Sequence, residues 1–476
     1  AVETERSVRG GDGIHETPPE TYDTVVKENV LVDSPAGAVP AVVEAIRTAR
    51  EHPQGPVRVG IPKDVLAGRT PQPAVGDREP AAPPTPSAAA VDEAADLLAD
   101  ANSPVLLAGG GVRRSGASDA LRSVAEELGA PVATTYKGKG TFPETHPLSA
   151  GVLCGGASAE FRDLLAGADV GLVVGSDLDA VATASWSVSM PETLIHVTLD
   201  GDDVGFGYET DLGVVADADR FLRALDARLD GDGAVDGASD GPRARSGADR
   251  AESVRTADRD RFAALSEPAD DDGSSEPGGR DDRPLRSVEV LSAVRDAVPE
   301  EAVVTADAGG FRLWTLVSFP ASGPRSYVNP GSWATMGTGL PSAIGAKLAN
   351  PDRDVVALTG DGGLMMCVHE LHTLATEGID VTVVALNNDD YAIISEEASR
   401  SYEFPEGAYG WADTGLDLVA VASGMGLPAE RVRERDAVGD AVERARARDG
   451  PALVEVVTDP EEPQASEWMT GPRPDE

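Results

Sequence analysis

The chain has 476 residues and a formal net charge of −42 at pH 7, from 82 acidic and 40 basic residues. Such a charge argues against nucleic acid and anionic membranes as partners, because both would repel it. No apolar run reaches the ~18–20 residues of a membrane span, and no signal peptide is visible, so we expect a cytoplasmic protein. Because 41% of the residues are hydrophobic, we predict a folded, halophilic protein whose acidic surface depends on salt screening.

Residues 1–68 contain one helical pattern and one short strand, "GPVRVGIPKDV". Two such elements are too few for a domain, so we interpret this segment as the end of a larger one. Residues 69–88 are rich in Pro and Ala, which indicates a linker.

Strand patterns alternate with helical patterns over residues 89–228 and again over residues 284–460, where a Gly-rich helix is expected from Thr335. This alternation is typical of doubly wound parallel sheets, so the sequence predicts an α/β fold. Residues 229–283 are rich in Asp, Gly, Ser and Arg, which predicts an acidic flexible linker. Residues 461–476 read as a polar tail. Cys154 and Cys367 lie in apolar segments and are interpreted as core thiols.

Three polar loops follow predicted strands of the last domain: "TADAGGF", "TGDGGL" and "LNNDDY". Ligands of open parallel sheets bind at the carboxyl ends of the strands. Gly362 and Gly363 begin a helix and leave room for a phosphate at its N-terminus. Asp361 and Asn388 offer the oxygen ligands that Mg²⁺ or Ca²⁺ takes. We therefore predict a divalent cation that holds a diphosphate.

Each motif alone has a simpler explanation, because Gly-Asp-Gly and Asn-Asn pairs often form turns. The two motifs on consecutive strands are more specific than either one. His369 and His372 lie one helical turn apart, but no third ligand at suitable spacing supports a zinc site.

The "GDG" and "NN" motifs and their spacing resemble the diphosphate-and-metal motif of thiamine-diphosphate-dependent enzymes. The stretch "NPGSWATMGTGLPSAIGAKLANPDRDVVALTGDGG" is most similar to the acetolactate synthase large subunit, within the group of 2-oxo-acid decarboxylases and carboligases. The resemblance covers nearly the whole chain. It implies a remnant of the pyrimidine-binding domain at 1–68, a Rossmann-like middle domain at 89–228 and the diphosphate-binding domain at 284–460.

The resemblance implies thiamine diphosphate and Mg²⁺ as cofactors. The metal ligands would be Asp361, Asn388 and the main-chain oxygen of Asp390, and Met336 would support the V-shaped cofactor. The other residues expected to contact the cofactor are Gly309, Gly310, Gly337, Gly360, Gly362, Gly363 and Tyr391. Family members often carry Gln and His where this chain has Gly310 and Phe311.

The family's catalytic Glu belongs to the first domain and is expected upstream of Ala1, so the chain resembles a fragment. Some members bind FAD through an Arg in the middle domain, but this chain has Ser176 to Asp179 at that place, which argues against FAD. The expected function is an acetolactate-synthase-like carboligase of 2-oxo acids, in branched-chain amino acid biosynthesis. A benzoylformate-decarboxylase-type lyase and a non-catalytic cofactor-binding or regulatory subunit are alternatives. The family implies a homodimer or homotetramer, and it leaves a small regulatory subunit open as a further partner.

The acidic composition predicts that the chain unfolds at a lower temperature in dilute buffer than in concentrated KCl. Salt shortens the range of repulsion between surface carboxylates, from ~10 Å at 0.1 M to ~3 Å at 1 M. Thermal unfolding followed by circular dichroism over a KCl series measures this effect. Equal midpoints throughout the series would contradict the halophilic interpretation.

Overall fold

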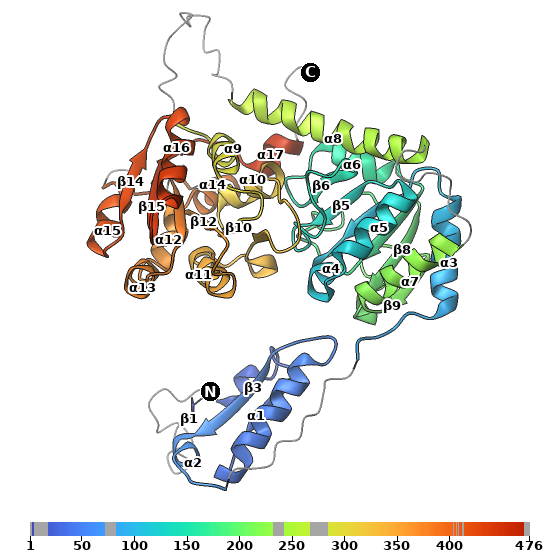
Figure 1. Ribbon diagram of the computed structural model, residues 1–476, viewed down its shortest axis with the longest axis horizontal. Helices are drawn as coiled ribbons and strands as arrows, with labels where there is room; N and C mark the ends of the chain where they lie inside the picture. The colour runs from blue at the N-terminus through green and yellow to red at the C-terminus, as the bar shows by residue number, and fades with distance from the viewer. Residues whose placement is uncertain are drawn as a thin grey trace, which may run out of the picture. The chain divides into compact units, whose positions relative to one another are not determined.

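The computed structural model describes residues 2–3, 18–71, 82–231, 242–266, 284–402, 404, 405, 407, 409–411 and 414–470 (Figure 1). Two compact units divide the chain. The small unit comprises residues 1–86 with the short segments 199–201 and 215–217, and the large unit comprises the rest.

The small unit contains a three-stranded parallel sheet in the order β1-β3-β2. Its elements are β1 (Val2–Glu3), η2 (Pro19–Tyr22), β2 (Glu28–Leu31), α1 (Pro35–Arg50), β3 (Val57–Pro62) and α2 (Lys63–Leu66). The apolar residues Val39, Val42 and Ile46 of α1 remain exposed. The sequence placed a helix and a strand here, and both are present.

The first half of the large unit is built on a sheet in the order β6-β5-β4-β7-β8-β9, parallel from β6 to β8. Every residue of β4, β5 and β7 is buried, as expected for strands covered by helices on both faces. The elements are α3 (Ala88–Asp100), β4 (Val105–Ala108), α4 (Gly110–Ser115), α5 (Ser118–Leu128), β5 (Val132–Thr135), β6 (Ser149–Leu153), α6 (Ala159–Ala166), β7 (Val170–Val174), β8 (Thr193–Thr198), η3 (Gly201–Asp203), β9 (Leu212–Val215) and α7 (Ala218–Gly231).

The second half contains a six-stranded sheet in the order β11-β10-β12-β13-β15-β14, with every pair parallel. Its elements are α9 (Ser287–Ala297), β10 (Val303–Ala306), α10 (Gly310–Ser318), β11 (Tyr327–Val328), η4 (Gly331–Trp333), α11 (Gly339–Ala349), β12 (Val355–Gly360), α12 (Asp361–Met366), α13 (Glu370–Glu377), β13 (Thr382–Asn387), α14 (Ala392–Tyr402), α15 (Leu418–Gly424), β14 (Ala429–Val432), α16 (Arg435–Arg446), β15 (Ala452–Val457) and α17 (Ala465–Thr470).

Successive residues of β12 point to opposite faces of this sheet, as the strand period of two requires. Val356 and Leu358 pack in one hydrophobic cluster, with α9, α10 and α16. Val355 and Ala357 pack in another, with α11, α13 and α15. Helices therefore cover both faces, and the predicted doubly wound α/β fold is confirmed.

The expectation of a flexible linker over residues 229–283 is wrong in part. Residues 242–266 form the long helix α8 (Pro242–Ser266), which packs on β6 and α6 (Figure 1). Its buried residues Ala251, Val254 and Leu265 follow helical spacing. They are few among many charges, so composition alone pointed to a linker. Residues 232–241 and 267–283, like 72–81 of the predicted linker 69–88, lie outside the described residues.

Two further expectations differ from the structure. The predicted tail 461–476 begins with ordered residues, because α17 buries Ala465 and Met469, whereas residues 471–476 lie outside the described part. The Gly-rich helix expected from Thr335 begins instead at Gly339. Gly337 has a φ of 80°, which a helix does not allow, so the preceding residues form a loop.

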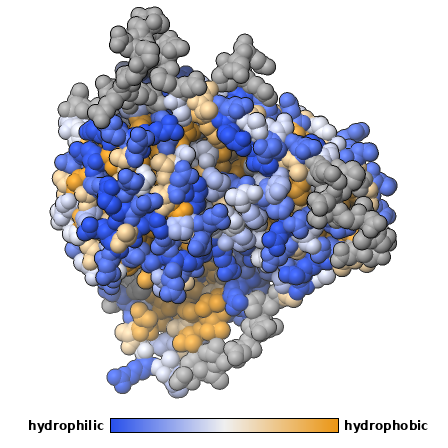
Figure 2. Space-filling model, turned by 45° about the horizontal axis from the view of Figure 1, so that its top comes forward, coloured by the Kyte–Doolittle hydropathy of each residue, from blue (hydrophilic) through white to orange (hydrophobic). Residues whose placement is uncertain are grey.

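Figure 2 shows hydrophilic side chains over most of the face in view, in keeping with the acidic composition. Within the described ranges, no helix is long and apolar enough to cross a bilayer. Cys154 and Cys367 are both free and buried, so the prediction of core thiols is confirmed.

Because α8 is part of the core, Leu265→Ala is expected to lower the free energy of unfolding by about 2–5 kcal/mol. Leu265 is fully buried, whereas the side chain of Arg259 on the same helix is 67% exposed. Arg259→Ala is the matched control and should change stability by less than about 0.5 kcal/mol. Urea unfolding in concentrated KCl measures both. Equal effects would show that α8 does not pack as described.

Candidate functional site

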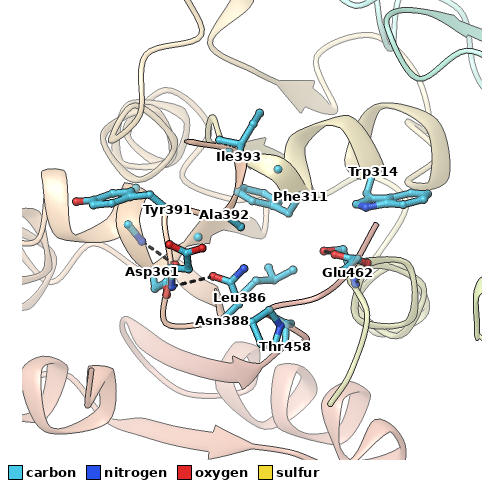
Figure 3. A pocket seen from close by; sticks show the side chains of 18 of the residues that line it. Phe311, Trp314, Asp361, Leu386, Asn388, Tyr391, Ala392, Ile393, Thr458 and Glu462 are labelled. Atoms are coloured by element: carbon cyan, nitrogen blue, oxygen red, sulfur yellow. Dashed lines mark hydrogen bonds between the residues drawn. The ribbon is translucent and has the colours of Figure 1, made fainter. Parts of the chain in front are cut away.

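A pocket of about 650 Å³, including its open mouth, lies at the carboxyl ends of β10, β12 and β13 (Figure 3). These strands are parallel neighbours, so the loops that follow them emerge at one edge of the sheet. The three loops predicted from the sequence therefore meet here, joined by the segment that follows β15.

Asp361 is the first residue of α12, directly after β12, and its side chain faces the pocket (Figure 3). It is only 3% exposed. Its Oδ1 accepts a hydrogen bond from the backbone N–H of Gly362 at 2.8 Å, but its Oδ2 has no hydrogen-bond partner among the described residues. Burial raises the pKa of Asp361 to about 7, and the N–H of Gly362 offsets part of this rise. A carboxylate in this position would be stabilised by a cation.

The two amides at the end of β13 have different roles. Asn387 is buried, and its Nδ2 donates to Glu455 Oε1 at 2.8 Å, so it belongs to the core. Asn388 lines the pocket, and its Oδ1 accepts only a long hydrogen bond, 3.3 Å, from the N–H of Asp390. Asp390 also lines the pocket, while its side chain accepts a hydrogen bond from Ser395. Asn388 is thus the amide available for a ligand.

The glycines that begin α12 are required by the close packing around the pocket. A Cβ at Gly362 would lie 2.4 Å from the ring of Tyr391, and one at Gly363 would lie 2.7 Å from Asp307 Oδ2. Any larger residue would displace these neighbours. The N–H of Gly362, at the start of the helix, is already donated to Asp361 Oδ1.

Asp307, at the end of β10, is a residue that the sequence reasoning missed. It is fully buried, and its carboxylate accepts hydrogen bonds from the N–H groups of Gly337 and Thr338 at 3.0 and 3.1 Å. The hydroxyl of Thr359 on β12 donates to it at 3.1 Å. Asp307 thus joins β10, β12 and the loop that carries Met336 into the pocket. The motif "TADAGGF" contains this acid, but only the tertiary structure reveals its partners.

The pocket wall away from Asp361 also went unpredicted. Phe311 and Trp314 on α10 line it together with Glu462 and Gln464 from the segment after β15 (Figure 3). The two oxygens of Glu462 accept hydrogen bonds from the N–H and the hydroxyl of Ser287, each at 2.6 Å. Burial raises the pKa of Glu462 to about 7, although these hydrogen bonds lower it in part. No local sequence pattern indicates this contact, because the two residues are far apart in the chain.

The structure brings nearly all predicted site residues together. Those that line the pocket are Gly309, Gly310, Met336, Gly360, Asp361, Gly362, Gly363, Asn388, Asp390 and Tyr391. Gly337 stands behind the lining, where its N–H bonds Asp307. The described residues contain no group of three His, Cys, Asp or Glu that could hold a metal, so a cation here would depend on amide and carbonyl oxygens besides Asp361.

Two family models match the chain. The C-terminal TPP-binding domain of thiamine pyrophosphate enzymes matches residues 307–456, and the central domain of these enzymes matches residues 91–225. The acetolactate synthase isozyme 1 large subunit of Escherichia coli is 30% identical over 464 residues, which cover 96% of this chain and 76% of that protein. A probable acetolactate synthase large subunit of Methanocaldococcus jannaschii is 29% identical, over 92% of this chain and 72% of that protein.

The chain belongs to the thiamine-pyrophosphate-dependent, acetolactate-synthase-like enzymes. The resemblance predicted from the "GDG" and "NN" motifs is thereby confirmed, and so is a thiamine-pyrophosphate-dependent enzyme. The acetolactate synthase large subunit of Corynebacterium glutamicum is similar as well, at 29% identity over 91% of this chain and 67% of that protein.

The pocket of this family member fits the diphosphate end of thiamine pyrophosphate with a divalent cation. The unpartnered Oδ2 of Asp361 and the amide oxygen of Asn388 are oxygen atoms of the type that Mg²⁺ prefers, and they could hold such a cation. The start of α12, at Gly362 and Gly363, lies beside these oxygens and is where a diphosphate could approach the backbone.

Asp307→Asn is expected to lower the free energy of unfolding by about 1–3 kcal/mol, because the new amide N–H₂ would face hydrogen-bond donors. It should also weaken Mg²⁺-dependent binding of thiamine diphosphate by loosening the Met336 loop. The matched control is Asp352→Asn, at an exposed loop position. Urea unfolding and calorimetric titration of both variants provide the measurement. If the two variants unfolded at the same urea concentration, the proposed role of Asp307 would be wrong.

Proposed function

We propose that this chain is part of an Mg²⁺- and thiamine-diphosphate-dependent carboligase of 2-oxo acids that acts like an acetolactate synthase. The single observation that carries the proposal is the buried, unpartnered carboxylate oxygen of Asp361 in the first turn of α12. The names of the relatives support carboligation as the reaction. Thiamine diphosphate, when bound, supplies a carbanion and an electron sink for decarboxylation of a 2-oxo acid.

In this proposal the residues of the chain bind and orient the cofactor. Asp361, Asn388 and the main-chain oxygen of Asp390 would hold Mg²⁺, and the start of α12 at Gly362 and Gly363 would face the diphosphate. Met336, on the loop fixed by Asp307, would contact the cofactor. The apolar side chains of Phe311, Leu386 and Ile393 exclude water from the remainder of the pocket.

A non-oxidative 2-oxo-acid decarboxylase is the second candidate. The observation that favours it is the segment after the amide pair, "NNDDYAIISEEASRSYEF", which lacks the Gly-Met and Gln-Trp residues expected for the second substrate of acetolactate synthases. The assembly we infer is a homodimer or homotetramer, and the large-subunit names of the relatives favour a small regulatory subunit as a partner. The residues from Ser176 to Asp179 stand where some family members have an Arg that binds FAD, and they argue against FAD as a cofactor.

Asp361→Asn tests the proposal with little change in shape. The variant should lose Mg²⁺-dependent binding of thiamine diphosphate, because the amide removes the charge that holds the cation. Without ligands it should unfold at the same temperature as the unaltered chain or higher, since a buried charge is removed. Glu377→Gln, an exposed acid on α13, is the control. Calorimetric titration and thermal unfolding measure the two effects.

Normal cofactor binding by Asp361→Asn would contradict the metal assignment. Product analysis with pyruvate separates the two reactions: acetolactate supports the carboligase, whereas acetaldehyde alone supports the decarboxylase.

A further inference from the structure

Residues 459–464 connect the end of β15 to the start of α17 and form one side of the pocket. Asp459, Pro460, Glu462, Pro463 and Gln464 all line it. We name residues 459–464 the wall segment. It has no regular secondary structure, so its position depends on contacts made by particular side chains and backbone groups.

The wall segment is attached at its first residue and again at Glu462. The N–H of Asp459 donates to the carbonyl of Leu285 at 2.8 Å. Glu462 receives the N–H and the hydroxyl of Ser287, each at 2.6 Å, and Ser287 is the first residue of α9. An anionic side chain at a helix N-terminus is favourable, because the free N–H groups and the helix dipole are both positive there.

The far end of the wall segment reaches the start of α10. Gln464 donates a hydrogen bond to Glu396 on α14. The same amide nitrogen lies 3.9 Å from the point where a Cβ would stand on Gly310, the first residue of α10. The wall segment therefore runs from α9 to α14. Between these helices it passes Gly310, which belongs to a loop expected to contact the diphosphate.

We propose that Glu462 is a positioning residue that fastens the wall segment to α9 and so fixes the pocket side that faces the cofactor diphosphate. The inference rests on the proposed function of the pocket. Glu462 itself does not need to touch the cofactor. Both of its oxygens are used by Ser287, so it acts through the segment it holds, including the placement of Gln464 over Gly310.

The carboxylate fits this role better than a neutral group of the same size. Both partners on Ser287 can donate, and a carboxylate accepts from both. In Glu462→Gln the amide oxygen can keep the N–H, while the amide nitrogen can donate to the hydroxyl oxygen, so part of the attachment remains. Glu462→Ala leaves both donors of Ser287 without this acceptor. Glu462→Ala should therefore weaken the attachment of the wall segment more than Glu462→Gln does.

The test uses the full chain in concentrated KCl and two measurements. Hydrogen–deuterium exchange of the ligand-free protein should speed up by about 10-fold or more for the amides of the wall segment in Glu462→Ala, since hydrogen bonds to charged groups are lost. Exchange within α9, at Val290–Val294, should not change. The exchange rate of the wall segment in Glu462→Gln should lie between those of Glu462→Ala and the unaltered chain. Glu461→Gln, at the exposed neighbouring residue, should match the unaltered chain.

The second measurement is calorimetric titration with thiamine diphosphate and Mg²⁺. Glu462→Ala should weaken cofactor binding by about 10-fold or more. Glu462→Gln should weaken it less, and Glu461→Gln should bind the cofactor like the unaltered chain. Ser287→Ala combined with Glu462→Ala should be no worse than Glu462→Ala alone, because the two residues share one interaction.

The outcomes separate the inference from the proposed function. Unchanged exchange of the wall segment in Glu462→Ala would overturn the inference, as would faster exchange with unchanged cofactor affinity. If the unaltered chain did not bind thiamine diphosphate with Mg²⁺, the proposed function would be wrong. The exchange data alone would then decide whether Glu462 attaches the wall segment to α9.

Discussion

Asp361 carries a buried carboxylate, and the described residues provide a hydrogen-bond partner for only one of its two oxygens. The arrangement of the residues around it follows from that constraint. One oxygen accepts a backbone N–H, and the other has no partner. Burying an uncompensated charge costs several kcal/mol unless a counter-ion is present or the group takes up a proton. A divalent cation removes this cost, so binding of a cation and stability of the site are linked.

Glu455 and Glu144, two other little-exposed acids of the large unit, differ from Asp361 because each is paired with a cationic side chain. Asp258 on α8 resembles Asp361, because its buried Oδ1 has no hydrogen-bond partner among the described residues. Glu455 lies 2.9 Å from Arg431 and receives the amide of Asn387. Glu144 lies 2.7 Å from the buried Lys139, which also donates to the carbonyl of Leu316 on α10. These pairs hold the sheet and α10 in place.

Much of the fold and the placement of Asp361 and Asn388 in one pocket could be predicted, because their signals are short-range. The strands β12 and β13 are continuous apolar runs, and Asp361 and Asn388 directly follow them. Parallel pairing then places both at one edge. Helix α8 could not be recognised from composition, because its buried residues are few and mostly small. The hydrogen bonds between Ser287 and Glu462 join residues 175 positions apart, and no local sequence pattern encodes such a contact.

Crystals of the chain grown with thiamine diphosphate and Mn²⁺ in place of Mg²⁺ would test the central claim most directly, through anomalous scattering at the manganese edge. The account predicts one strong peak in contact with the side-chain oxygens of Asp361 and Asn388 and with the cofactor diphosphate. A cofactor bound elsewhere, or a manganese peak that leaves Asp361 without a ligand, would contradict it.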